Sequence, residues 1–354
     1  MQETKRRPRR AARAALLALA AAAVLTAALV PGAKAAGTGG TRYVVPLGSA
    51  VGIKLFSEGV LVVGFTDVTT AEGPANPARE SGLREGDVIT RLDGRAVSTI
   101  EEVQQVLTRQ GDRAVSLTVR RDGREREMTV QAARCAADGA WRLGAWIRDS
   151  MAGVGTLTFA DPDTGLFGAL GHGVSDADTA VLLSLQSGAV TPAAVAGVVK
   201  GADGSPGQLR GAFDQDRDLG TLFANTERGV FGYLTDPGSL TGRALPVAEP
   251  DQVHPGPATI LANVSGTEVA AYSAEILKVF DHAADSRDLM LRVTDRRLLD
   301  QTGGIVQGMS GSPILQDGRL AGAVTHVLID HADRGYGVLA CHMLETAEES
   351  APAP

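Results

Sequence analysis

The sequence predicts a mainly β protein with two folded units behind an N-terminal segment. Short apolar runs recur along the chain, and Gly, Pro and Asp separate them, as is typical of strands joined by tight turns. Of the 354 residues, 43 are glycine, and within residues 141–348 no long amphipathic helix pattern stands out before the C-terminus. The length favours two domains. A hydrophobic content of 44% with 21% charged residues is enough for packed cores.

Residues 1–35 have the pattern of a targeting segment. Lys and Arg crowd residues 5–13, an uncharged apolar run follows at 14–30, and Ala33-Lys34-Ala35 closes it with an A-x-A pattern. This order predicts a signal peptide or an uncleaved membrane anchor. Both alternatives stay open, and either one implies that the rest of the chain crosses a membrane. Residues 36–41, "AGTGGT", are expected to be a flexible linker.

The charge distribution argues against nucleic acid as a partner. Residues 1–35 hold seven of the 34 basic residues but one of the 41 acidic residues, so the remainder is more acidic than the formal −7 of the whole chain. Phosphate binding needs clustered positive charge. No Cys or His cluster has zinc-ligand spacing, so we expect neither metal nor cofactor. Cys135 and Cys341 are the two cysteines, and the sequence leaves open whether they form a disulfide or stay free thiols.

The first unit, residues 42–133, alternates strands, helices and turns. Gly59–Phe65 is a short apolar run that predicts a buried strand, and a second strand is expected at Val88–Leu92. Ser98-x-x-Glu101 predicts a capping box at the start of a helix. Asp122-Gly123, between two alternating segments, predicts a β-hairpin.

This first unit resembles a PDZ domain, above all in "SGLREGDVITRLDGRAV" and the earlier "SAVGIKL". The resemblance implies binding of an extended peptide or a peptide C-terminus as an added strand. It also implies that the loop 49–54 receives the peptide, with Gly52 and Ile53 as amide donors and Lys54 as a positive charge. The alternative is a tight turn before a strand.

The second unit, residues 141–348, consists of many short apolar segments and predicts an all-β barrel or sandwich. Residues 349–354 are expected to be a disordered tail.

The words "QGMSGSP" point to a serine nucleophile. Glycines at 308 and 311 let the backbone around Ser310 bend sharply. The amides of Gly308 and Ser310 can then converge on an oxyanion. The pattern is similar to the nucleophile loop of chymotrypsin-like peptidases, and Ser312 is a minor alternative nucleophile. It differs from the G-x-S-x-G elbow, since Ser312 replaces the last glycine.

A serine nucleophile needs a base, and His172 in "FGALGHGVSDADT" is the strongest candidate among six histidines. It lies between glycines after a strand-like run. The others are His254, His282, His326, His331 and His342.

With these residues and the segments around them, the chain resembles the stage IV sporulation protein B serine peptidases of endospore-forming bacteria. The matching words are "ALGHGVSDADT", "TDRRLLDQTGGIVQGMSGSPILQDGRLAGAVTHV" and "GYGV". The resemblance implies a membrane segment, a PDZ domain and a chymotrypsin-like double β-barrel peptidase domain. It implies His172 as base, Asp295 as the orienting acid and Ser310 as nucleophile. Asp214, Asp216 and Asp218 remain rival acids.

The resemblance also implies a biological role. By the resemblance, the protein is expected to be a signalling protease of sporulation that acts in the space between forespore and mother cell. It would cleave an inhibitory membrane complex so that pro-sigma-K is processed, and it would cleave itself. Two alternatives stay open: a catalytically inactive PDZ scaffold, and a general quality-control protease.

Thr325 and His326 are hypothesised to line a substrate side-chain pocket, since they fall on the strand expected to follow the serine loop. The alternative for His326 is a structural role in the core.

Overall fold

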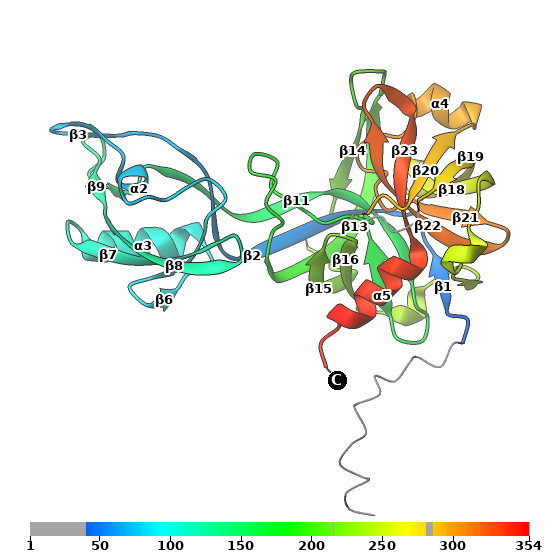
Figure 1. Cartoon of the computed structure of the whole chain (residues 1–354), viewed down its shortest axis with the longest axis horizontal. Helices are drawn as coiled ribbons and strands as arrows, with labels where there is room; N and C mark the ends of the chain where they lie inside the picture. The colour runs from blue at the N-terminus through cyan, green and yellow to red at the C-terminus, as the bar shows by residue number, and fades with distance from the viewer. Residues whose placement is uncertain (1–39, 215, 281–285, 354) are drawn as a thin grey trace, which may run out of the picture. The chain divides into compact units, whose positions relative to one another are not determined.

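The protein is described by a computed structural model that covers residues 40–214, 216–280 and 286–353. The expected targeting segment at 1–35 and most of the linker at 36–41 lie outside these residues, as does His282. Strands make up most of the structure (Figure 1), so the prediction of a mainly β protein is confirmed. Within the described residues, no helix combines the length and the apolarity that spanning a membrane would require.

The first of two barrels is closed by pairings that run β2, β11, β12, β16, β15, β13 and back to β2. Its strands are β2 (Ala50–Phe65), β11 (Ala145–Ala160), β12 (Leu166–Ala169), β13 (Leu185–Val199), β15 (Gly220–Thr226) and β16 (Gly229–Leu234). Leu55, Phe167 and Val190 are buried in its core.

The second barrel is closed in the order β18, β19, β20, β23, β22, β21. Its strands are β18 (Gly256–Ser265), β19 (Glu268–Val279), β20 (Leu289–Val293), β21 (Pro313–Gln316), β22 (Arg319–Leu328) and β23 (His331–Leu339). Ile260, Leu289 and Met309 are buried in its core. These two six-stranded barrels confirm the expected double-barrel peptidase domain.

A separate core belongs to the PDZ domain, and it includes Val62, Leu92 and Leu117. The second half of β2 pairs with β5 (Val88–Leu92), which pairs with β7 (Ala114–Arg121), which pairs with β8 (Arg124–Gln131). The other elements of this part are β3 (Val68–Thr70), β4 (Gly73–Ala75), α2 (Pro77–Glu80), β6 (Arg95–Ala96) and α3 (Ile100–Gln110).

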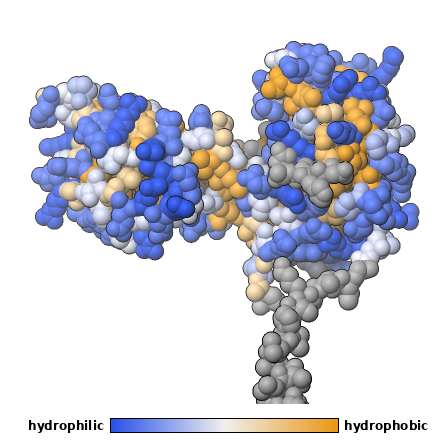
Figure 2. All heavy atoms as spheres, viewed as in Figure 1, coloured by the Kyte–Doolittle hydropathy of each residue, from blue (hydrophilic) through white to orange (hydrophobic). Residues whose placement is uncertain are grey.

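The remaining elements are short strands and helices, and α5 is the last of them. They are β1 (Tyr43–Pro46), β9 (Ala133–Arg134), β10 (Trp141–Arg142), β14 (Gln208–Phe213), η1 (Pro237–Ser239), β17 (Leu245–Pro246), η2 (Pro250–Gln252), α4 (Arg296–Thr302) and α5 (Ala340–Ser350). Because α5 runs to Ser350, it extends into the segment that was expected to be a disordered tail. On the face drawn in Figure 2 the surface is mostly hydrophilic with scattered hydrophobic patches.

Several PDZ elements lie at or within one residue of the positions that the sequence predicted. The expected strands at Gly59–Phe65 and Val88–Leu92 are present. Asp122 and Gly123 have φ of 50° and 71°, which is the paired left-handed geometry of a type I′ hairpin turn. The capping box is one residue later than predicted: Thr99 is the N-cap and Glu102 its partner.

The boundary of the PDZ domain differs from the predicted 42–133. Strand β2 runs without interruption from Ala50 to Phe65, and its first half belongs to the first barrel. β1 also pairs with the barrel strand β11. A sequence pattern does not mark this change, because a strand that leaves one core and enters another remains an apolar strand throughout.

Cys135 and Cys341 are both buried free thiols, so the structure decides against a disulfide. Burial raises the pKa of the Cys341 thiol to about 12, which keeps it protonated and unreactive.

A buried ion pair stabilises the PDZ domain and provides a test of its independence. The Arg121 Nε lies 2.6 Å from Oδ1 of Asp87, whose side chain is fully buried. Asp87→Ala leaves the guanidinium without its carboxylate partner, with only the Gly82 carbonyl at 2.9 Å, which we expect to cost about 3 kcal/mol. Hydrogen exchange should then rise in β5 and β7 and stay unchanged in the second barrel. Asp122→Asn, at the exposed hairpin turn, is the control and should leave hydrogen exchange unchanged in the PDZ strands and in the second barrel.

Candidate active site

One cavity of about 730 Å³ brings together residues from both barrels. His172, from the loop after β12, lines it together with Ser310, from the loop before β21, and His326 of β22. The loop residue Gly308 lines it as well. Residues 138 positions apart in the chain are therefore neighbours at one site, as the nucleophile and base of a serine peptidase must be.

The serine loop has the sharp geometry that its glycines allow. Gly308 and Gly311 have φ of 99° and 95°, values that side chains with a Cβ rarely adopt. A Cβ on Gly311 would collide with the carbonyl of Thr156, so a glycine is needed there for the loop to approach β11. Met309 is fully buried beneath the loop and anchors it.

The amides expected to form the oxyanion hole are available. Within the described residues, neither the Gly308 N–H nor the Ser310 N–H donates a hydrogen bond. The carbonyls of the same residues are held: Thr156 Oγ1 donates to Gly308 O at 2.8 Å, and Thr156 N donates to Ser310 O at 3.2 Å. The Gly308 and Ser310 N–H groups share their peptide units with the carbonyls of Gln307 and Met309. These carbonyls accept from Leu209 N at 2.8 Å and from Ser312 N at 2.9 Å, so both amide donors are held in place, which suits oxyanion binding.

His172 is held in the tautomer that a base requires. Its Nδ1 lies 2.8 Å from the carbonyl oxygen of Gly173. Because a carbonyl only accepts hydrogen bonds, Nδ1 carries the proton and Nε2 keeps its lone pair. Burial lowers the pKa of His172, and the Gly173 hydrogen bond opposes this effect. The imidazole is therefore neutral near pH 7 and able to accept a proton.

The serine and the histidine are not hydrogen-bonded in this conformation of the described chain. Ser310 Oγ donates instead to the carbonyl of Thr325 at 2.8 Å. The His172 ring stacks obliquely on His326, with centroids 5.1 Å apart. Catalytic hydrogen bonds of this kind are often unformed without substrate. Attack by Ser310 on a substrate would require its side chain to rotate away from the Thr325 carbonyl.

Asp295 does not meet His172, so the expected triad contact is absent from the structure. Its carboxylate caps α4 by accepting a hydrogen bond from Arg297 N at 2.9 Å, and it pairs with the Arg297 guanidinium at 2.8 Å. It also accepts from Ser273 N at 3.2 Å. The hydrogen bonds from Arg297 lower the pKa of Asp295 to about 2. The rival acids Asp214, Asp216 and Asp218 are likewise not among the cavity-lining residues.

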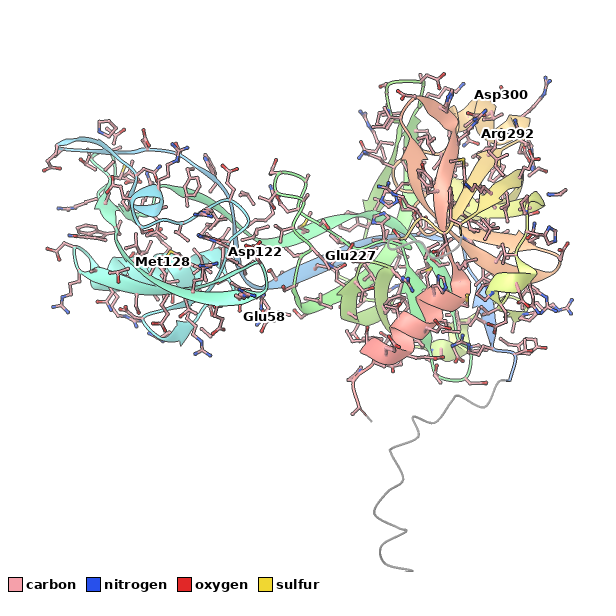
Figure 3. All side chains as sticks on the ribbon, in the orientation of Figure 1. Glu58, Asp122, Met128, Glu227, Arg292 and Asp300 are labelled. Atoms are coloured by element: carbon pink, nitrogen blue, oxygen red, sulfur yellow. The ribbon has the colours of Figure 1, made fainter. Side chains whose placement is uncertain are left out.

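Among the described residues, the carboxylates that line the cavity are Asp176 and Glu227. Asp176 is buried, pairs with Arg148 and accepts hydrogen bonds from Asp178 N and Thr179 N, so it folds the loop that follows His172. Glu227 is exposed in the turn between β15 and β16 (Figure 3). Neither carboxylate hydrogen-bonds to His172 in the described residues.

Of the other residues predicted for the site, some line the cavity and some are buried in the core. His326 lines the cavity, but the Thr325 side chain is buried and donates to Ser286 O at 3.1 Å. The pocket hypothesis therefore holds geometrically for His326 alone. Ser312 is fully buried outside the cavity, which disfavours it as nucleophile. The other described histidines, His254, His331 and His342, do not line the cavity.

The prediction that residues 49–54 form a peptide-binding loop of the PDZ domain is wrong. Gly52, Ile53 and Lys54 lie inside β2, and each pairs with β11 on one side and β13 on the other. Their backbone groups are committed to the barrel and cannot receive a peptide.

A groove of about 470 Å³ lies instead between α3 and the start of β11. Ile100 and Gln104 line its helical side, and Ala145 and Ile147 line the strand side. Ile147 is opposite Val62, whose N–H and C=O bond to residues 86 and 87, away from β11. Ile147 and Val62 are therefore a non-hydrogen-bonded pair, in which each residue directs its backbone N–H and C=O away from the other. Ile147 then presents its N–H and C=O on the groove side.

The sequence analysis missed Asn225, whose side chain makes three hydrogen bonds beside the His172 loop. No local signal marks it, because its partners lie 51 and 42 residues earlier in the chain. No cluster of His, Cys, Asp and Glu suited to a metal ion occurs in the described part of the chain.

Two family models and a curated relative match this chain in sequence. A sequence model of the SpoIVB peptidase S55 family matches residues 139–344, and a model of the PDZ domain matches residues 59–132. The magnetosome formation protease MamE of Paramagnetospirillum magneticum (strain ATCC 700264 / AMB-1) is 39% identical over 87 residues, which are 24% of this chain and 11% of MamE. The chain thus spans a small fraction of that relative.

Two solved structures are similar at low identity. The active form of the Rv3671c protease of M. tuberculosis has a TM-score of 0.36 and 16% identity, covering 58% of this chain and 76% of that one. The PDZ domain of an SdrC-like protein of Listeria monocytogenes has a TM-score of 0.21 and 19% identity, covering 25% of this chain and 87% of that one.

The contacts of Asp295 predict a structural role that depends on pH. Its pKa of about 2 lies below the ordinary 3.8, so its contribution to stability is complete above pH 4 and lost as the pH falls through 2. Asp295→Asn should therefore lower the melting temperature at pH 7, and the difference from the wild type should shrink toward pH 2. Asp300→Asn, at an exposed position of the same helix (Figure 3), is the matched control. Equal melting curves for Asp295→Asn and the wild type at pH 7 would contradict this role.

Proposed function

We propose a signalling role for this chain, which belongs to the SpoIVB peptidase S55 family. It is a serine peptidase that carries a PDZ domain, and proteins or peptides are its substrates. In the proposed role it is exported by means of residues 1–35, as a cleaved signal or a retained anchor. It then acts between forespore and mother cell, where it cleaves an inhibitory membrane complex so that pro-sigma-K is processed. The match to the family over residues 139–344 carries this proposal.

The chemistry follows from the cavity. Ser310 turns from the Thr325 carbonyl toward His172, whose Nε2 takes the hydroxyl proton as Oγ attacks the scissile carbonyl. The amides of Gly308 and Ser310 bind the oxyanion that forms. His172 then gives its proton to the leaving amine, and water hydrolyses the acyl-enzyme with His172 again as base.

The resting contacts of the serine favour a triggered protease over a general quality-control protease. A hydroxyl tied to the Thr325 carbonyl and not bonded to His172 keeps basal activity low. Low basal activity suits an enzyme that cleaves one target when its partner binds. The same enzyme is proposed to cleave itself when it becomes active.

Labelling with a fluorophosphonate probe tests the peptidase assignment. We expect the full chain to be labelled at Ser310 slowly, over long incubation, because the resting hydroxyl is bonded to the Thr325 carbonyl and the probe needs a nucleophile activated by its base; mass spectrometry maps the label. Ser310→Ala should abolish labelling, and His172→Ala should slow it about 10²-fold or more. Ser312→Ala is the control and should be labelled normally. Intact mass during incubation of the wild type and Ser310→Ala reports self-cleavage.

An inactive scaffold predicts a different result. In that case the folded wild type would remain unlabelled at every serine, and partner binding would be the same in Ser310→Ala and the wild type.

The PDZ domain is proposed to bind an extended apolar peptide in the groove between α3 and β11. The outward N–H and C=O of Ile147 offer an edge for an added strand, and Ile100 offers an apolar wall. A ligand there reads alternate side chains, since those on one face of an added strand point toward the helix.

A substitution in the groove separates this binding from catalysis. Ile100→Lys should weaken the binding of fluorescent extended apolar peptides about tenfold, as measured by anisotropy, because a charge replaces apolar contact. Val199→Lys is the matched control, since Val199 and Ile100 are each 39% exposed and Val199 lies on β13 of the barrel. Equal affinities for the two variants would count against the groove.

A further inference from the structure

Among the described residues, the His172 ring is oriented by a group other than a carboxylate. In Ser-His-Asp enzymes the acid accepts a hydrogen bond from Nδ1 and so fixes the tautomer and direction of the ring. Here Nδ1 bonds to the Gly173 carbonyl at 2.8 Å, and Asp295 is engaged with Arg297 and Ser273. The peptide group that carries this carbonyl therefore determines where the imidazole points.

Asn225 holds that peptide segment from both of its polar atoms. Its Oδ1 accepts a hydrogen bond from Val174 N at 2.8 Å, and its Nδ2 donates to Val174 O at 2.9 Å. The same Nδ2 donates to Leu183 O at 2.8 Å. Leu183 N in turn donates to Val174 O, so Asn225 closes the base of the loop between Val174 and Leu183.

A close backbone approach brings the loop to this strand. A Cβ on Gly173 would lie 2.7 Å from the carbonyl oxygen of Thr226, nearer than a Cβ contact tolerates. Glycine at 173 therefore lets the His172 loop lie directly against β15 and the turn after it. Asn225 is at the end of β15, one residue before this contact.

We infer that Asn225 is a positioning residue for His172. It fixes the Gly173–Val174 peptide, so that the Gly173 carbonyl keeps His172 in the Nδ1–H tautomer. During attack the Ser310 proton moves to Nε2 while the Nδ1 proton stays on the ring, hydrogen-bonded to the same carbonyl. This inference deepens the proposed peptidase chemistry and rests on it for the roles of Ser310 and His172.

The tautomer of His172 in the wild-type chain is the first test. Nitrogen-15 NMR of the imidazoles, assigned with His172→Gln, should show a proton on Nδ1 and none on Nε2 at a pH where the ring is neutral. A wild-type His172 with its proton on Nε2 overturns the inference, whatever the activity of the enzyme.

Two variants of Asn225 are the second test. Asn225→Ala removes all three hydrogen bonds, and Asn225→Asp keeps the acceptor for Val174 N but loses both donors. We expect both to give a mixture of His172 tautomers and to slow fluorophosphonate labelling of Ser310 about tenfold or more, since a small misplacement of a catalytic group is costly. Asn225→Asp should be the less affected of the two.

The matched control is Asn263→Ala. Asn263 also bonds through both side-chain atoms, to Ser265 N and Gly266 O, but in the second barrel. It should lose stability while the His172 tautomer and the labelling rate stay as in the wild type. If the Asn225 variants match the wild type in tautomer and rate, the inference is wrong.

The outcomes also separate this inference from the proposed function. A wild type that is not labelled at Ser310 refutes the peptidase chemistry, while the tautomer of wild type and variants still decides the role of Asn225. If Asn225→Ala does not fold, the wild-type spectrum and Asn225→Asp decide it.

Discussion

Thr156 of β11 joins the two halves of the active site, and the geometry of the cavity depends on it. Its N–H donates to Ser310 O, its hydroxyl donates to Gly308 O, and its carbonyl accepts from Leu170 N, two residues before His172. The side chain is buried, so these hydrogen bonds are shielded from water. One residue of the first barrel thus fixes the serine loop of the second barrel and the approach to the histidine. The glycine at 311 allows this contact because any Cβ there would meet the Thr156 carbonyl.

Strand β22 controls the resting state from the opposite side. The Thr325 carbonyl accepts the Ser310 hydroxyl, and the next residue, His326, stacks on His172. A small movement of this strand relative to the serine loop changes both contacts together. In the structure the serine hydroxyl therefore has one hydrogen-bonded position, on the Thr325 carbonyl.

The strand β11 links the peptide groove to the cavity. Its first residues, including Ala145 and Ile147, line the groove beside α3, while Met151 to Val154 of the same strand line the active-site cavity. β2 pairs with β11 along this whole length. Two continuous paired strands therefore serve both the PDZ domain and the peptidase barrel.

The sequence by itself determined the features that depend on neighbouring residues. The turn at Asp122-Gly123 needs left-handed backbone that Asp and Gly tolerate, so its position follows from local sterics. The serine loop is fixed in the same way by its glycines, and the candidate base was found from its Gly-His-Gly setting. The mainly β class followed from short apolar runs, whose spacing does not depend on the fold.

Only the tertiary structure decided what depends on contacts between distant segments. Asp295 has the same sequence neighbours whether it caps α4 or orients a histidine, and the position of α4 settles that it caps the helix. Gly52 to Lys54 look like a loop before a strand, but pairing with β11 and β13 makes them part of one. Asn225 has no local signal, since its hydrogen bonds form only when the barrel closes and brings β15 against the His172 loop.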